Sequence, residues 1–225
     1  MIEVLVKVCG LTEVSDALAS AEAGADWIGL NFHPKSPRSI SARRAAEIAS
    51  ALLGKAEPVG LFVDRPFEDV AATLLEVGSM DIVQFHGDEP PEYLRRFADF
   101  DPALRLVKAF RLSDEASVDR MIAYLDRAQA LGCPPFAILV DAHVPGQSGG
   151  TGRSIPVDVL DRIPAHPRLI LAGGLTPDNV ADRVDRVRPW MVDVASGVES
   201  SPGIKDPALV SRFVAEARRI RASAH

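Results

Sequence analysis

The chain has 225 residues, of which 47% are hydrophobic and 25% are charged, as in an ordinary soluble globular protein with one well-buried core. Its formal net charge of −6, without a long basic run, argues against a nucleic-acid surface but not against a small anion held by backbone amides. No apolar stretch approaches the roughly 18 residues of a membrane span, and the first residues do not resemble a secretory signal, so we expect a cytoplasmic protein with no membrane partner.

Short apolar runs alternate with segments of helical periodicity eight times along the chain. Most of the runs are continuously apolar, as in parallel strands that are covered on both faces. The predicted strands are residues 4–8, 27–32, 59–63, 82–85, 104–109, 136–140, 169–171 and 191–194. Helix starts are indicated by Pro66, by Pro90, by Ser113 as an N-cap, and by Thr176 before Pro177. No linker divides the chain, and the pattern predicts a single (β/α)8 TIM barrel over residues 1–225, with a doubly wound open sheet as the alternative.

Polar and glycine residues gather where the predicted strands end, which is where barrel enzymes place their reacting groups. The strand starts show nothing comparable, so this asymmetry indicates an enzyme. The residues concerned are Lys7, Cys9, Gly10, Asn31, His33, Gln84, His86, Lys108, Asp141, Gly173, Gly174, Ser196 and Gly197.

Cys9 is the candidate catalytic base. A lone cysteine in a strand is most often a small buried apolar residue. Cys9, however, ends its strand, precedes a Gly-Leu-Thr turn and follows Lys7 by two residues, which places both side chains on one face of the strand. A nearby ammonium favours the thiolate, the form that can accept a proton. Cys133 lacks this context and is interpreted as structural, and two cysteines are too few for a disulfide framework.

Three further rim residues have a structural interpretation, and two of them, Asp141 and Arg38, also have a chemical one. Asp141 is as compatible with a loop carboxylate as with a general acid, which would need burial to keep its proton. Arg38, after a rigid Ser-Pro turn, is either a surface charge or a fork for a carboxylate. His86 is suited to brace the turn after the fourth strand. The sequence has no HxH or histidine–carboxylate cluster at ligand spacing, so no metal site is predicted.

Two glycine turns end the seventh and eighth predicted strands, where barrels commonly bind phosphate through backbone N–H groups. They contain Gly173-Gly174 and Ser196-Gly197, and their position on adjacent strands favours a phosphate site over two simple turns. Residues 146–154 resemble a P-loop superficially, but the lysine is missing and the glycine spacing is off by one. We interpret that segment as a loop able to close over substrate.

Taken together, these segments resemble the phosphoribosylanthranilate isomerase family over nearly the whole chain. Each matching block is weak by itself, whereas their order and spacing are highly specific. The blocks are residues 7–12 (KVCGLT), 24–26 (GAD), 36–38 (SPR), 83–89 (VQFHGDE), 149–152 (GGTG), 171–175 (LAGGL), 196–199 (SGVE) and 203–206 (GIKD).

The resemblance implies an aldose–ketose isomerase of tryptophan biosynthesis. Its reaction is the Amadori rearrangement of N-(5-phosphoribosyl)anthranilate to 1-(2-carboxyphenylamino)-1-deoxyribulose 5-phosphate by general acid–base catalysis. It assigns the general base to Cys9 and the general acid to Asp141, and it implies no metal or organic cofactor, because the nitrogen of the substrate serves as the electron sink. The expected partner is this small phosphorylated substrate, bound by a monomer or a homodimer.

The resemblance also implies how the substrate is held. Arg38 would bind the anthranilate carboxylate, and Lys7, Gln84 and His86 would be further substrate-binding residues. The turns with Gly173, Gly174, Ser196 and Gly197 would bind the phosphate.

The chain departs from the family pattern after Gly152, where residues 153–157 (RSIPV) replace the usual basic-Thr-Phe-Asp-Trp stretch. One rival is the histidine-pathway isomerase, which resembles a duplicated half-barrel and has aspartate where Cys9 stands. A second rival is a non-catalytic phosphate-binding barrel, which loss of Cys9 or Asp141 would indicate. This chain shows no duplication and keeps both residues.

Overall fold

The computed structural model of the chain describes residues 3–142, 159, 162–163 and 166–219. Within these residues, eight parallel strands pair in sequence order and close into a barrel. The strands are β1 (Leu5–Cys9), β2 (Trp27–Asn31), β3 (Glu57–Phe62), β4 (Ile82–Phe85), β5 (Arg105–Leu112), β6 (Ala137–Ala142), β7 (Leu169–Leu171) and β8 (Met191–Val194). The closing pair is β1 with β8, in the register Leu5↔Met191 to Val8↔Val194. This pairing confirms the barrel and excludes the open sheet.

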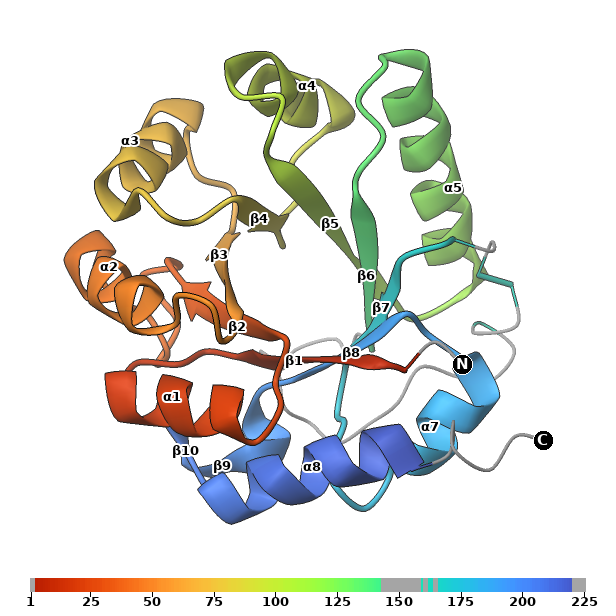
Figure 1. Cartoon of the computed structure of the whole chain (residues 1–225). Helices are drawn as coiled ribbons and strands as arrows, with labels where there is room; N and C mark the ends of the chain where they lie inside the picture. Colours follow the sequence, from red (N-terminus) through yellow and green to blue (C-terminus); the bar gives the residue numbers. More distant parts are fainter. Residues whose placement is uncertain (1–2, 143–158, 160–161, 164–165, 220–225) are drawn as a thin grey trace.

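Helices surround the barrel and cover the outer face of its strands (Figure 1). They are α1 (Val14–Glu22), α2 (Ala42–Ala51), α3 (Phe67–Val77), α4 (Pro91–Phe100), α5 (Glu115–Ala130), α7 (Val180–Val187) and α8 (Pro207–Arg219). A short 3-10 turn, η1 (Ser196–Val198), follows β8 and leads into a two-stranded hairpin of β9 (Glu199–Ser201) and β10 (Ile204–Lys205). No helix among the described residues is long and apolar enough to span a bilayer.

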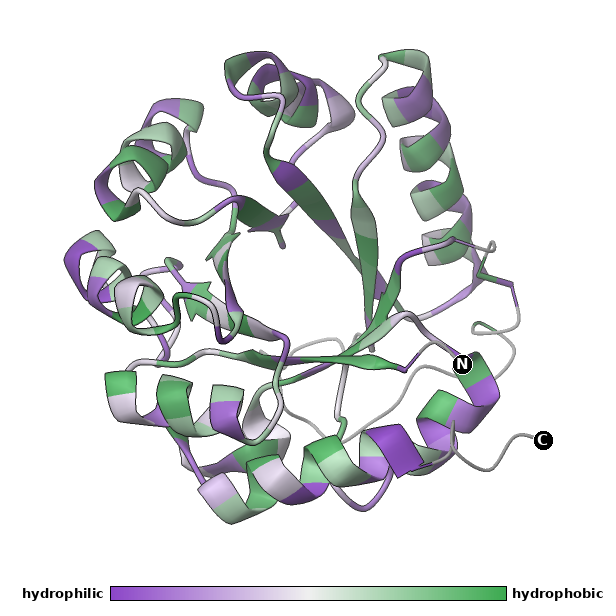
Figure 2. Ribbon diagram, in the orientation of Figure 1, coloured by the Kyte–Doolittle hydropathy of each residue, from purple (hydrophilic) through white to green (hydrophobic). Residues whose placement is uncertain are grey.

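The apolar runs of the sequence become strands because both of their faces are buried, as the predominantly apolar colouring of the barrel in Figure 2 illustrates. In β1, Val6 and Val8 point outward into the core beneath the helices. In β5 and β6, Val107 and Leu139 point inward, into a second apolar cluster inside the barrel. Alternate residues of a strand therefore fill two separate cores.

Strand positions agree closely with the sequence prediction. Residues 82–85, 169–171 and 191–194 form strands with the predicted bounds, and the other five differ by one to three residues at their ends. Strand β6 continues through Asp141 to Ala142, so Asp141 lies within a strand. Helices α3 and α4 begin directly after Pro66 and Pro90, as predicted.

Two predicted helix starts are wrong. Helix α5 is capped by Asp114 and not by Ser113, because the Asp114 side chain accepts a hydrogen bond from the Ser117 N–H and forms a capping box. Helix α7 begins at Val180, three residues beyond Pro177. The reason is a turn before it: the Asn179 side chain accepts from the Thr176 N–H at 2.9 Å and donates to the Gly174 carbonyl at 2.9 Å.

Candidate active site

The carboxyl end of β1 brings Lys7 and Cys9 to the inner face of the barrel. Lys7 is fully buried, and its Nζ donates a hydrogen bond of 3.0 Å to Oδ2 of Asp193 on β8. The two residues are also register partners across the β1–β8 pair. The expected neighbourhood of Lys7 and Cys9 is therefore present. The direct substrate contact predicted for Lys7 is not supported, because its ammonium is enclosed and already paired with a carboxylate.

Burial and charge act on the Cys9 thiol in opposite directions. Burial raises the pKa of Cys9, and the carboxylate of Asp193 raises it further, whereas the ammonium groups of Lys7 and Lys205 lower it. The net pKa is raised. Burial alone would lower the pKa of Lys7, but Asp193 and Cys9 hold it above its usual value. Lys7 thus favours the thiolate as predicted, but the effect of burial on the Cys9 pKa is larger.

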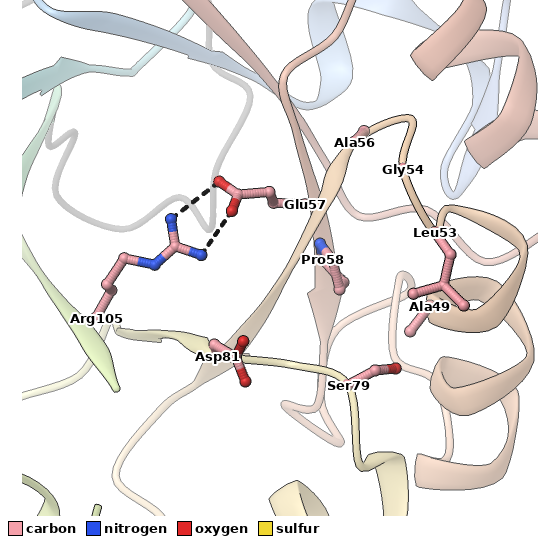
Figure 3. Close-up of a pocket in the computed structure, with 9 residues that line it drawn as sticks. All are labelled: Ala49, Leu53, Gly54, Ala56, Glu57, Pro58, Ser79, Asp81 and Arg105. Atoms are coloured by element: carbon pink, nitrogen blue, oxygen red, sulfur yellow. Dashed lines mark hydrogen bonds and ion pairs between the residues drawn. The ribbon is translucent and has the colours of Figure 1, made fainter. Parts of the chain in front are cut away.

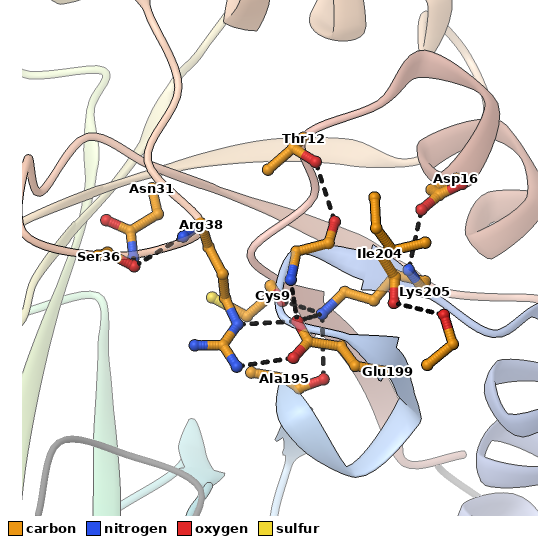
Figure 4. A network of polar contacts seen from close by, with 12 residues as sticks. Cys9, Thr12, Asp16, Asn31, Ser36, Arg38, Ala195, Glu199, Ile204 and Lys205 are labelled. Atoms are coloured by element: carbon orange, nitrogen blue, oxygen red, sulfur yellow. Dashed lines mark hydrogen bonds and ion pairs between the residues drawn. The ribbon is translucent and has the colours of Figure 1, made fainter.

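Arg38 lies beside Cys9 and forms a two-pronged ion pair within the chain (Figure 4). Its Nε donates to Oε1 of Glu199 at 2.8 Å, and its Nη2 donates to Oε2 at 2.7 Å. The arginine stem crosses Gly10, where a Cβ would come within 2.4 Å of the Arg38 Cδ. Gly10 has a φ of +80°, so the turn after β1 needs glycine for both conformation and space.

Glu199 occupies one edge of the Arg38 guanidinium, the group that was predicted to bind a substrate carboxylate. A guanidinium presents a second edge, formed by Nη1 and Nη2, and Nη1 of Arg38 points away from Glu199 (Figure 4). Burial would raise the pKa of Glu199, but its bonds to Arg38 and Lys205 hold the pKa below its usual value. Glu199 is therefore a charged partner that fixes the orientation of Arg38.

A second polar group lies at the ends of β4 and β6. Gln84 is buried, and its Nε2 lies 3.0 Å from Nδ1 of His86. Nε2 of His86 lies 3.6 Å from Oδ2 of Asp141, which is too long for a direct hydrogen bond. The side chain of Asp141 is 26% exposed, so the burial expected for a general acid is only partial. The structure thus brings His86 and Asp141 together, with Gln84 fixing the imidazole from behind.

The two glycine turns lie against each other, as the phosphate prediction requires. Gly173 and Gly174 have φ values of +89° and +64° after β7. A Cβ on Gly197 in η1 would lie 1.9 Å from the carbonyl oxygen of Leu175, so the two turns touch through backbone atoms. Ser196 is exposed next to this contact. The phosphate contact itself stays a prediction.

The comparisons with known proteins agree with this geometry. The model of the N-(5'phosphoribosyl)anthranilate (PRA) isomerase family matches residues 6–216. The N-(5'-phosphoribosyl)anthranilate isomerase of Geobacter sulfurreducens is 43% identical over 217 residues, which are 96% of this chain and 98% of that one. The chain belongs to this isomerase family.

Solved structures of PRA isomerases share the fold over nearly the whole chain. That of Thermotoga maritima is 36% identical, has a TM-score of 0.83, and covers 96% of this chain and 99% of its own. Another structure of the family, at 36% identity and a TM-score of 0.79, is a complex with reduced 1-(o-carboxyphenylamino)-1-deoxyribulose 5-phosphate, with coverage of 96% and 99%. The family and the barrel predicted from the sequence are confirmed.

Sequence reasoning missed three charged residues of this isomerase site: Asp193, Glu199 and Lys205. Lys205 is 3% exposed and donates from Nζ to the carbonyl oxygens of Cys9 and Ala195. The GIKD block at residues 203–206 was the available signal, but it suggested no role. The predicted loop at residues 146–154 lies outside the described residues. Among the described residues, no group of three or more His, Cys, Asp or Glu side chains is arranged to hold a metal ion.

A separate pocket of about 220 Å³ lies at the opposite end of the barrel from the predicted PRA isomerase site (Figure 3). It is formed where β3 and β5 begin, around Glu57, Asp81 and Arg105. Two hydrogen bonds of 2.7 and 3.0 Å join Arg105 to Glu57. None of the predicted catalytic or binding residues lines this pocket.

Proposed function

We propose that Cys9 and Asp141 carry out the proton transfers of the reaction that this family catalyses. The reaction is the Amadori rearrangement of N-(5'-phosphoribosyl)anthranilate in tryptophan biosynthesis. Asp141 donates a proton to the ribose ring oxygen, and the ring opens to a Schiff base. Cys9 then removes the proton from C2, and the resulting enolamine tautomerises to the ketone. One proton is given and one is taken, as an aldose–ketose isomerisation requires.

The observation that carries this assignment is the charge around Cys9. Three cations act on Cys9: Lys7 and Lys205, which are buried, and Arg38, which is partly exposed. Two carboxylates, Asp193 and Glu199, pair with them. With all five groups ionised, one positive charge is left without a partner. A thiolate at Cys9 would neutralise it, which supports Cys9 as the group that holds and accepts the proton.

The substrate of this reaction carries a carboxylate at one end and a phosphate at the other. We place the carboxylate on the edge of Arg38 that Glu199 leaves open, where two N–H groups can bind it side by side. The phosphate lies on the turns with Gly174 and Gly197, whose backbone can approach an anion closely. The ligand of the related complex also carries a carboxylate and a phosphate, which supports a site with one binding group for each.

Gln84 and Lys7 act behind the residues that meet the substrate. Gln84 is 1% exposed and sets the imidazole of His86, which then lies beside Asp141. His86 is therefore a substrate contact in this proposal, whereas Lys7 and Gln84 position their neighbours. We further propose that residues 1–225 form one domain, that no cofactor is needed, and that the protein is cytoplasmic. It would act as a monomer or a homodimer; the Thermotoga maritima relative is described as dimeric.

Complementation of a tryptophan auxotroph that lacks this isomerase tests the proposal. The wild-type gene should restore growth, and Cys9→Ala and Asp141→Asn should not. In the purified proteins, each substitution should lower kcat by about 10²–10⁴-fold. Cys133→Ala is the matched control, because Cys133 is a buried thiol that packs among core residues near α4. Growth with both Cys9→Ala and Asp141→Asn would overturn the mechanism, and failure of folded wild type to restore growth would overturn the substrate.

A further inference from the structure

We infer that Lys205 is a positioning residue of this isomerase, which holds the thiol of Cys9, the phosphate turn and Arg38 in one fixed frame. The inference rests on the roles proposed above for Cys9 and Arg38. Lys205 does not reach the substrate in this account, because it is almost completely enclosed. It acts through the Cys9 thiol, the phosphate turn and Arg38, which do reach the substrate in this account.

All three N–H bonds of the Lys205 ammonium have acceptors (Figure 4). Nζ donates to the carbonyl oxygen of Cys9 at 2.7 Å, to that of Ala195 at 3.0 Å and to Oε1 of Glu199 at 2.8 Å. Cys9 carries the proposed base, Ala195 directly precedes the phosphate turn, and Glu199 binds Arg38. One ammonium therefore connects the three parts of the site.

Lys205 lies where the β1–β8 pairing, which closes the barrel, comes to its end. The β1–β8 register runs from Leu5↔Met191 to Val8↔Val194 and stops there. Cys9 and Ala195 are the next residues of the two strands. Instead of pairing with each other, their carbonyl oxygens share the Lys205 ammonium. The bridge fixes both strand ends at the point where the backbone turns toward the reacting groups.

The β9–β10 hairpin holds Lys205 in place by its own contacts with the loop after β1 and with α1. The Lys205 N–H donates to Oδ2 of Asp16 at 2.9 Å. The Thr12 hydroxyl donates to the Gly203 carbonyl at 2.9 Å, and the Gly203 N–H donates to Oε1 of Glu199 at 3.2 Å. The lysine is thus anchored at its backbone as well as its ammonium, as expected of a residue that positions others.

Lys205 also sets the charge that faces the thiol. Cys9 is surrounded by Lys7 and Asp193 from within the barrel, and by Lys205, Arg38 and its partner Glu199 from the rim. Removing the Lys205 charge leaves two cations and two carboxylates, so a thiolate would no longer neutralise a spare positive charge. Formation of the thiolate should then move to higher pH.

The test is the pH dependence of Cys9 alkylation by iodoacetamide, measured in a Cys133→Ala background so that one thiol reacts. In Lys205→Met, the midpoint should rise by about half a pH unit or more. In steady-state kinetics, kcat should fall by about tenfold or more with a smaller change in KM, because the base is displaced rather than the substrate. Lys205→Arg, which keeps the charge, should restore most of the alkylation profile.

Lys108→Met is the matched control. Lys108 is also 3% exposed, and it is likewise bonded to a carboxylate, Glu89 at 3.1 Å, and to a carbonyl oxygen, that of Gly87 at 2.6 Å. It points toward the ring of Tyr124 on α5, away from Cys9. Both methionine variants should lose stability, but only Lys205→Met should move the alkylation midpoint.

Equal alkylation midpoints in Lys205→Met and Lys108→Met, with equal loss of kcat, would overturn the inference. If Lys205→Met does not fold, the pH profile of Cys9 alkylation is measured in Lys205→Arg instead. If the alkylation midpoint of Lys205→Arg is displaced while its kcat equals that of wild type, the positioning role is refuted. Activity that survives in Cys9→Ala would refute the base assignment. A shifted midpoint in Lys205→Met would in that case still show that Lys205 controls the thiol, so the two failures are distinguishable.

Discussion

Replacing Gly197 with alanine should disturb the turn that we propose for the substrate phosphate. The new Cβ would lie 1.9 Å from the Leu175 carbonyl oxygen and 3.0 Å from its carbon. Carbon–oxygen contacts are normally about 3.3 Å or longer, so the two turns must separate by more than about 1 Å. Both obstructing atoms belong to the backbone and cannot rotate away. Overpacking of this kind costs about 1–3 kcal/mol, and we expect the upper end, which lowers the melting temperature by roughly 6–12 °C in a chain of this size.

The assay combines thermal unfolding with steady-state kinetics. Gly197→Ala should raise KM for the phosphorylated substrate several-fold, because the backbone N–H groups of the turn move away from the phosphate. Gly54→Ala is the control: Gly54 has a φ of +73° but no neighbour within 4 Å, so it adds only backbone strain of about 1 kcal/mol, far from the site. A wild-type KM in Gly197→Ala, with no greater thermal loss than in Gly54→Ala, would refute this reasoning.

Three further predictions concern charge. Because burial raises the pKa of Cys9, kcat/KM should still be rising as the pH passes through neutrality. A plateau of kcat/KM that is reached below neutral pH would contradict a thiolate base. Lys7→Met should cost about 3–5 kcal/mol in urea unfolding by leaving Asp193 buried and unpaired, and Lys7→Met/Asp193→Leu should recover most of that loss while remaining inactive. Arg105 holds the pKa of Glu57 below its usual value, so the pair stabilises the fold above the unfolded pKa of Glu57 and loses this contribution as pH falls through the lower folded value. Since half of the Glu57 side chain is exposed, Glu57→Gln should cost less than about 1 kcal/mol at neutral pH and nothing in acid; an equal cost at both would refute the linkage.

The strands could be predicted because a barrel strand has a simple local signature. Residues 136–140 and 169–171 are apolar on both faces, and burial on both faces is what the barrel imposes. Helix starts were less predictable, because several nearby side chains compete for the same N–H groups. At α5, Asp114 and Ser113 are both good caps, and the choice is made by the bond to the Ser117 N–H. At α7, Asn179 closes a turn that delays the helix past Pro177.

Side-chain contacts within the candidate site were predictable from spacing only where the residues are close in sequence. Lys7 and Cys9 share a strand face by a spacing of two, which sequence shows directly. Arg38 meets Glu199 across 161 positions, and Lys205 meets Cys9 across 196. Nothing local marks Glu199 as the partner that occupies one edge of the arginine. Such contacts follow from closure of the barrel between β1 and β8, which brings the two ends of the chain together.

The inside of the barrel holds both apolar residues that stabilise the fold and charged residues that lie next to the candidate site. Its apolar cluster includes Val59, Ile82 and Met191, and this part stabilises the fold by burial. On the same inner face, nearer the carboxyl ends of the strands, Lys7 and Asp193 are buried instead, and Oδ1 of Asp193 has no hydrogen-bond partner. A buried ion pair with an unsatisfied oxygen is seldom worth more than a well-packed apolar pair. We therefore explain the Lys7–Asp193 pair, in which Lys7 precedes Cys9 by two residues, by the charge that it places around the site. This charge is gained with some loss of stability.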